Sequence, residues 1–218
     1  METAFDLERQ ALIASGLREK NRISEYLDKL SSISSRFMSA GSLSFPIELR
    51  PRQLFVGLWQ DNPKRYRPQG NYRLNQVIDA QILGRPPGIG NCLGLTLLYN
   101  CLLRLIGIDP QVVYLEDTFG LRPHLLTHLN IAHSSIDIDN MLPDGFDYKG
   151  YINEPTRVLW GHAELVADVY HSVGNELFEQ GALSEALFNY DKALELNPHY
   201  ERARLNRVIL FDRMKMGN

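Results

Sequence analysis

The segment from His128 to Asp139 alternates apolar and polar residues, and this pattern constrains the fold more than any other stretch. Successive side chains of a strand point to opposite faces of a sheet. If His133 and Ser134 form a two-residue turn, one face of the resulting hairpin carries Leu129, Ile131, Ile136 and Ile138. The other face carries His128, Asn130, Asp137 and Asp139. A slip of one residue would mix the two faces, so the apolar pattern itself selects this register.

The predicted register places His128 directly opposite Asp139, with β-carbons about 5 Å apart. An acid at that distance can orient an imidazole and stabilise its charged form. Asp137 is the competing acid, but in this register it faces Asn130. The hairpin therefore predicts His128 as a general base and Asp139 as its partner.

Two alternatives to this pairing remain open. His-Ser is not a favoured pair for a two-residue turn, so the connection could be longer. His124 is the alternative base, although in this register it falls opposite Pro143 and away from the acid.

Cys92 lies where a glycine-rich turn meets a strongly apolar segment, which predicts a helix to about Ile106 ended by Gly107. The first amide groups of a helix have no internal partner, and the helix dipole adds positive potential there. A thiolate is stabilised at such a point, and the same amides can hold an oxyanion. Cys92 is therefore the candidate nucleophile, whereas Cys101 reads as a buried apolar residue.

The two cysteines are not expected to pair. On one helix they would lie on opposite faces, about 13 Å apart along the axis, whereas a disulfide needs α-carbons within about 7 Å. The chain also lacks the ligand spacings of a structural zinc site, so neither a metal nor a cofactor is expected.

The order of expected elements is helices, then one helix with a small antiparallel sheet, then helices, which indicates an α+β fold. The apolar spacing predicts helices at about residues 4–40, interruptible at Gly16, and at 52–59, 71–83, 92–106 and from about 155 onward. Strand-like segments are expected at residues 111–115, 128–131 and 136–139.

Two segments of the chain resemble the transglutaminase-like superfamily. The first runs from Asn71 to Asp79, and the second is Gly90-Asn-Cys, which opens an apolar helix that runs through Tyr99. They look like a bacterial branch that often joins this core to tetratricopeptide repeats. Members commonly carry an acid shortly before Gly-Phe-Asp, and here Asp139 precedes residues 145–147. The resemblance covers roughly residues 50–150.

This resemblance implies a papain-like core, in which the helix carrying Cys92 packs on the sheet. It also implies acyl transfer at an amide through a Cys-His-Asp triad, ending in hydrolysis, deamidation or cross-linking. Gln76 and Asn91 are candidate oxyanion donors. The family's histidine usually lies further from the acid than His128 does, which keeps His124 as the alternative base.

Residues 167–200 follow the 34-residue tetratricopeptide pattern, and a further helix is expected at 201–214. The apolar positions of that helix are Ala203, Leu205, Val208, Ile209 and Phe211. We expect a transglutaminase-like domain over residues 1–155 and a helical repeat over 156–218. A lone repeat either packs on the core and extends it, which we favour, or offers a groove to a peptide.

The net charge of −3 argues against general attraction to nucleic acid, and no segment has the pattern of a signal peptide or membrane span. We therefore expect a cytoplasmic protein, and the resemblance implies that it acts on a protein or peptide. The competing functional hypothesis is a non-catalytic adaptor that binds a protein partner through the repeat and the N-terminal helices. A small-molecule acyl donor ranks last, because no cofactor-binding loop is evident.

Overall fold

The computed structural model describes residues 5–37, 46–84, 88–118, 122–131 and 134–216. The helices are α1 (Leu7–Ala14), α2 (Lys20–Phe37), η2 (Ile47–Leu49, a 3-10 helix), α3 (Arg50–Asp61), α4 (Leu74–Leu83), α5 (Cys92–Leu105), α6 (His162–Glu179), α7 (Leu183–Leu196) and α8 (Glu201–Met216). The strands are β1 (Gln111–Thr118), β2 (Arg122–Ile131), β3 (Ser134–Ile138) and β4 (Arg157–Trp160). The mixed α+β class expected from the sequence is confirmed.

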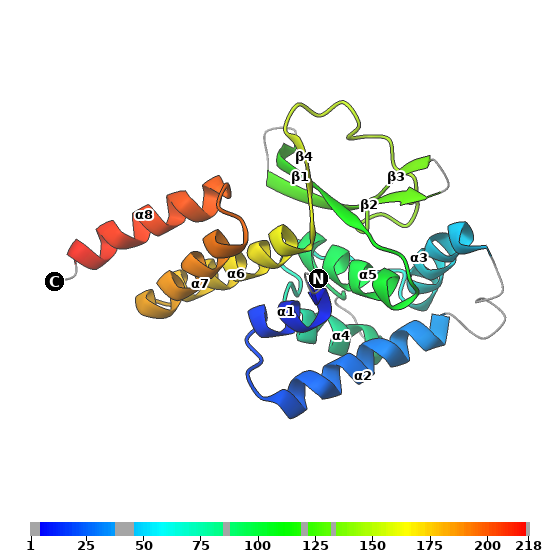
Figure 1. Cartoon of the computed structure of the whole chain (residues 1–218), viewed down its shortest axis with the longest axis horizontal. Coiled ribbons are helices and arrows are strands. Elements are labelled where there is room, and N and C mark those ends of the chain that lie inside the picture. The colour runs from blue at the N-terminus through cyan, green and yellow to red at the C-terminus, as the bar shows by residue number, and fades with distance from the viewer. Residues whose placement is uncertain (1–4, 38–45, 85–87, 119–121, 132–133, 217–218) are drawn as a thin grey trace.

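The four strands form one antiparallel sheet in the order β3-β2-β1-β4. Helix α5 lies against this sheet through β2, and α2 and α4 pack on α5 from the other side (Figure 1). The Thr96 hydroxyl of α5 donates a hydrogen bond of 3.2 Å to the Leu125 carbonyl of β2. The helix that begins at Cys92 is thus enclosed between the sheet and the N-terminal helices.

Helix α5 is buried on all sides because it is apolar around its whole circumference. Every residue from Leu93 to Leu103 is buried, and Cys101 is fully so. Cys92 and Cys101 are both free thiols, as the spacing argument predicted. Among the described helices, none pairs the length with the apolar character required to cross a bilayer.

The long N-terminal helix expected from the sequence is two helices, α1 and α2, separated at the position where an interruption was anticipated. Gly16 has a φ of +102°, which a side chain would strain, and the chain turns there. The gap between the helices expected at residues 4–40 and 52–59 lies partly outside the described residues, and α3 begins at Arg50, two residues before the expected start.

The pairing of β2 with β3 differs from the predicted register by two residues. His128 lies opposite Asp137, not Asp139, and Ile131 pairs with Ser134. The predicted turn pair His133-Ser134 is therefore wrong, since Ser134 belongs to β3 and residues 132–133 lie outside the described part. The face assignment survives, because a slip of two keeps every side chain on its own side.

Residues 157–160 form strand β4, where the sequence pattern predicted only helix. This strand pairs with β1 at the sheet edge, so the C-terminal helices begin at His162. Val158 and Leu159 are about half exposed, as an edge strand allows. The division of the chain after residue 155 stays a prediction, although the sheet continues past that point.

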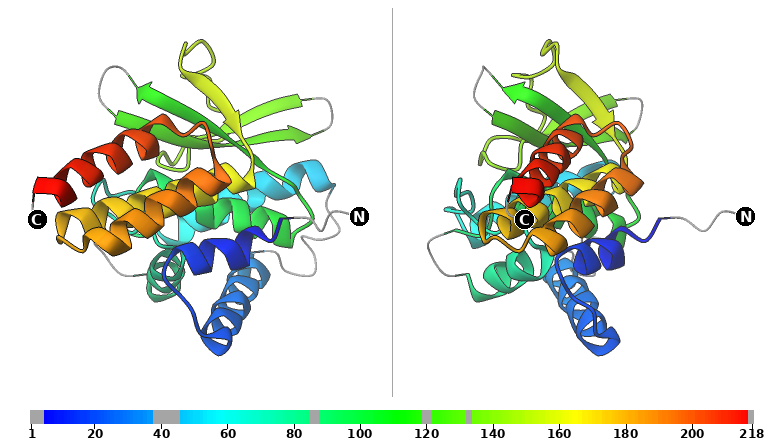
Figure 2. Two further views of the ribbon diagram at one scale, coloured as in Figure 1. Left: turned by 60° about the vertical axis from the view of Figure 1, so that its left-hand side comes forward. Right: turned by 90° about the vertical axis from the view of Figure 1, so that its left-hand side faces the viewer.

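The C-terminal helices α6, α7 and α8 stack side by side, and α6 lies nearest the core (Figure 2). Gly174 of α6 lets α7 approach closely, because a Cβ there would lie 2.6 Å from the Tyr190 ring. The helix expected at residues 201–214 is α8, and its apolar residues do not all face the core. Ala203 and Leu210 are buried, but three apolar residues are about half exposed or more: Leu205, Val208 and Ile209.

Candidate active site

Cys92 is the first residue of α5, and the structure places it at the mouth of a pocket. The side-chain oxygen of Asn91 caps the helix by accepting a 3.0 Å hydrogen bond from the Gly94 amide. The amides of Cys92 and Leu93 precede the first intrahelical bond, which runs from Leu95 to the Asn91 carbonyl. The half-buried thiol therefore lies beside backbone donors that can stabilise negative charge.

The Asn71 carbonyl fixes the backbone around this cysteine. It accepts a 3.0 Å hydrogen bond from the Asn91 amide and lies directly against two glycines. A Cβ on Gly94 would lie 2.2 Å from this oxygen, and one on Gly90 would lie 2.7 Å from it. The glycines of the Gly-Asn-Cys-x-Gly stretch are thus required by the close approach of the loop that precedes α4.

His124 of β2 and Asp139, directly after β3, form a buried pair. His124 Nε2 lies 3.0 Å from Asp139 Oδ2, and the Met141 amide donates a 3.0 Å hydrogen bond to Asp139 Oδ1. Asp139 is completely buried, and its amide donates to the Gly145 carbonyl. This contact uses Nε2 of the imidazole and leaves Nδ1 for another partner.

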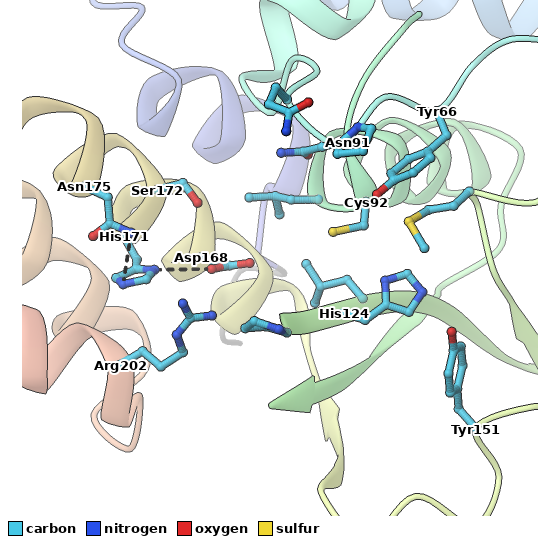
Figure 3. Close-up of a pocket in the computed structure, with 16 residues that line it drawn as sticks. Tyr66, Asn91, Cys92, His124, Tyr151, Asp168, His171, Ser172, Asn175 and Arg202 are labelled. Atoms are coloured by element: carbon cyan, nitrogen blue, oxygen red, sulfur yellow. Dashed lines mark hydrogen bonds and ion pairs between the residues drawn. The ribbon is translucent and has the colours of Figure 1, made fainter. Parts of the chain in front are cut away.

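The Cys92 thiol lies on the pocket side of the His124 ring, and both side chains reach into the same space (Figure 3). Burial lowers the pKa of His124, but hydrogen bonds with Asp139 and Cys92 outweigh it and raise the pKa to about 9. The imidazole is therefore charged at neutral pH. The Tyr151 ring meets the imidazole edge to face at 5.4 Å between centroids and covers one side of it.

His128, the base predicted from the sequence, lies in a different buried cluster. Its Nδ1 is 2.7 Å from Asp137 Oδ1, and both Arg157 terminal nitrogens donate to the same carboxylate at 2.8 and 3.0 Å. Burial would raise the pKa of Asp137, but these hydrogen bonds lower it below its ordinary value. The predicted pairing of His128 with Asp139 is wrong, because β3 is displaced by two residues.

The pocket in front of Cys92 has a volume of about 810 Å³. Its walls include Asn91 and Gln69 near the thiol, and it extends to residues of α6 and to Arg202 of α8. Gln76, a predicted oxyanion donor, is exposed on α4 and is not among the pocket's lining residues. Asn91, the other predicted donor, lines the pocket, although its oxygen is engaged by the helix cap.

Sequence reasoning missed the length of β2 and the contribution of the C-terminal helices to this pocket. The strand begins at Arg122, so His124 is a strand residue with a fixed orientation. The pattern Pro123-His124-Leu-Leu carried that signal, but Pro123 argued against a strand there. No sequence signal would have brought Arg202 to the same pocket, since that contact depends on how the repeat docks.

The arrangement supports a definite chemistry. An imidazole between a thiol and a carboxylate can take up the thiol proton and keep the resulting ion pair in place. The adjoining helix amides lie where charge would develop on an attacked carbonyl oxygen. Among the described residues, no group of three or more His, Cys, Asp or Glu side chains could hold a metal ion.

Comparison with known proteins bears first on the C-terminal helices. The family model "Tetratricopeptide repeat" matches residues 167–200, which span most of α6 and all of α7. These residues form a tetratricopeptide repeat. Proteins use such repeats to bind other proteins, so the match supports a protein-binding role for this end of the chain. No curated protein sequence matches the chain.

Solved structures of Legionella pneumophila LapG are similar to the chain. LapG matches with a TM-score of 0.39 and 11% identity, over 72% of this chain and 87% of LapG. Its calcium-bound form gives the same values, and its EGTA-treated form differs only in a coverage of 85%. A TM-score this low carries no argument about shared activity.

Proposed function

We propose that the protein is a thiol enzyme of the transglutaminase-like type that performs acyl transfer at an amide. Cys92 is the nucleophile, His124 the base and Asp139 the group that orients the imidazole. One observation carries the proposal: the His124 ring is bonded to a buried carboxylate and lines the same pocket as a half-buried thiol, which helps to raise its pKa. His128 has no part in this chemistry.

The reaction begins from an ion pair, in which the Cys92 proton has already passed to His124 and the sulfur is a thiolate. The thiolate attacks the amide carbonyl carbon, a C–S bond forms, and the carbonyl π electrons move to oxygen. The amides of Cys92 and Leu93 hold that oxyanion, with Gln69 as a further candidate donor because it lines the same pocket. Collapse re-forms the carbonyl and breaks the C–N bond, while His124 gives its proton to the leaving amine.

The second half of the reaction opens the thioester. Water or a primary amine attacks the acyl carbon, its proton passes to His124, and the Cys92 sulfur leaves. Water gives hydrolysis or deamidation, whereas an amine gives a new amide. The substrate that we propose is a protein or peptide in the cytoplasm, and the cycle uses no cofactor.

The test is incubation of the full-length protein with a bacterial proteome peptide library whose amines are blocked, together with a fluorescent primary amine. Mass spectrometry then reports new N-termini, glutamine-to-glutamate conversion and amine incorporation in one experiment. We expect at least one of these products with the wild-type protein and with Cys101→Ala, and none with Cys92→Ala. Equal product in Cys92→Ala, or none with any variant, would overturn the proposal.

The second candidate function is a non-catalytic adaptor, which the tetratricopeptide repeat favours. An adaptor would keep its biological role in a Cys92→Ala strain. Loss of that role with an unchanged amount of folded protein would rule the adaptor out.

A further inference from the structure

The pocket in front of Cys92 is continued by a polar face of the tetratricopeptide repeat. Four residues of α6 line it together with Cys92 and His124: Asp168, His171, Ser172 and Asn175. They are spaced three or four apart and so share one face of the helix. Figure 3 shows labelled side chains of α6 and Arg202 on one side of the hollow, with Cys92 and His124 on the other.

A second hollow of about 310 Å³ extends this surface away from the thiol. It is lined by Glu179 of α6 and Asn206 of α8, and Asn175 lines both hollows. From Asp168 to Glu179 α6 rises about 16 Å, which is the length of about five residues of extended peptide. The two hollows together therefore span the length of a short peptide, and Cys92 lines the first of them.

The polar groups of this face are held rigidly by one another. Asn206 Nδ2 lies 3.0 Å from His171 Nε2 and donates to Asn175 Oδ1 at 2.8 Å, where the Tyr190 hydroxyl also donates. The Asn175 amide has two N–H donors, and its one partner within the described residues is His171 at 3.4 Å. Asn175 thus keeps a fixed donor for an incoming carbonyl oxygen.

Arg202 of α8 places a positive charge in the pocket of Cys92. It is half-buried, it lines the same pocket as Cys92, and within the described residues it makes no ion pair. The nearby Asp168 carboxylate accepts a hydrogen bond from the Tyr200 hydroxyl and lies 3.6 Å from His171 Nδ1. A half-buried guanidinium without a carboxylate partner favours an anionic ligand group.

We propose that the repeat binds the polypeptide substrate of the thiol site. An extended polypeptide lies along α6 and α8, Asn175 donates to its main chain, and Arg202 pairs with a carboxylate close to the amide that Cys92 attacks. That the bound polypeptide is a substrate rests on the proposed function, but its binding can be measured without catalysis. The substrate class is a polypeptide with an acidic side chain or a terminal carboxylate near the reacting amide.

The test uses the full-length protein carrying Cys92→Ala, so that binding is separated from any reaction. The probes are fluorescein-labelled degenerate decapeptides, each with Asp or Lys fixed at one position, prepared with amidated and with free C-termini. Fluorescence polarisation gives affinities for this protein and for three further variants: Arg202→Gln, Arg202→Glu and Arg204→Gln. Arg204→Gln is the matched control, because it removes the same charge from α8 at an exposed position bonded to Glu201.

We expect either Asp at one position or a free C-terminus to tighten binding about tenfold. The probe that binds more tightly shows whether the carboxylate comes from a side chain or from the C-terminus. Arg202→Gln should abolish that preference, Arg204→Gln should keep it, and Arg202→Glu should reverse it toward Lys. A reversal cannot arise from misfolding. Absence of binding by every probe, or the same Asp preference in Arg202→Gln, would overturn the inference, whether or not Cys92 is reactive.

Discussion

The imidazole of His124 lies between two groups that both favour its charged form. Asp139 is completely buried and bonded to it, and the Cys92 thiol is its other partner. Desolvation opposes the charge, yet the pKa of His124 rises to about 9 because both contacts act in a site shielded from water. The same shift makes His124 a proton donor that persists at neutral pH, as a leaving amine requires.

Folding stability should therefore depend on pH through His124. Its pKa is about 9 in the folded chain and about 6.5 when unfolded, so its stabilisation is complete below pH 6.5 and is lost as pH rises through 9. We expect His124→Asn to reduce the free energy of unfolding by on the order of 3 kcal/mol at pH 6 and by much less at pH 10. Urea denaturation of both proteins across that range measures the difference.

A His124→Asn effect that is equal at pH 6 and pH 10 would contradict the raised pKa, because it would reflect lost packing alone. The comparison with the wild-type chain at each pH removes contributions from other titrating groups.

The start of α5 is positioned by close contact with the Asn71 backbone, so it should not tolerate an added side chain at its glycines. We predict that Gly94→Ala destabilises the protein by about 1–3 kcal/mol or more, because its Cβ would lie 2.2 Å from the Asn71 carbonyl. Urea denaturation measures the loss. Gly57→Ala is the matched control within a helix, since its Cβ meets only the movable Phe37 ring at 2.8 Å.

Gly57→Ala should cost far less than Gly94→Ala, because its Cβ displaces a side chain and not a backbone carbonyl. Equal effects of the two substitutions would contradict the account of the glycine contacts with Asn71.

Arg157 ties the start of β4 to β3 across the sheet through its bidentate contact with Asp137. Arg157→Met should cost about 3 kcal/mol in the free energy of unfolding, because a buried carboxylate loses its bidentate partner. The alkylation rate of Cys92 should stay at the wild-type value, since this cluster is separate from His124. A large fall in that rate in folded protein would show that His128 and Asp137 belong to the reactive site.

Several helices could be predicted from the sequence, but the register between the paired strands could not. The helix start at Cys92, the break at Gly16 and the tetratricopeptide helices follow from local patterns. The hairpin register does not, because a shift of two residues keeps Leu129 and Ile136 on the same face. With that shift the partner of Asp139 is His124, the alternative base named from the sequence, and not His128.

At the scale of the whole molecule, the repeat is built into the main core. Val169 of α6 and Ala193 of α7 are fully buried in the same cluster as α5, and Glu176 pairs with Arg73 at 3.0 Å. Trp160 stacks on Tyr114 at 3.8 Å between centroids, where the sheet meets the C-terminal helices. The repeat and the sheet therefore share contacts that neither could keep alone.

We predict that the sheet and the repeat unfold together in one transition. Urea denaturation followed by tryptophan fluorescence reports on Trp59 and Trp160, and far-ultraviolet circular dichroism reports on all helices. The two curves should coincide. Separated midpoints would contradict a shared core and would instead support independent units on the two sides of residue 155.

The most direct test of the central claim is the rate at which iodoacetamide alkylates each thiol at pH 6.5, resolved by mass spectrometry. Burial raises the pKa of Cys101 well above its ordinary value, so that thiol is the slow internal reference. We predict rapid labelling of Cys92, a loss of tenfold to a hundredfold in His124→Ala, and no such loss in His128→Ala. Equal, slow labelling of both cysteines in the wild-type protein would contradict the claim.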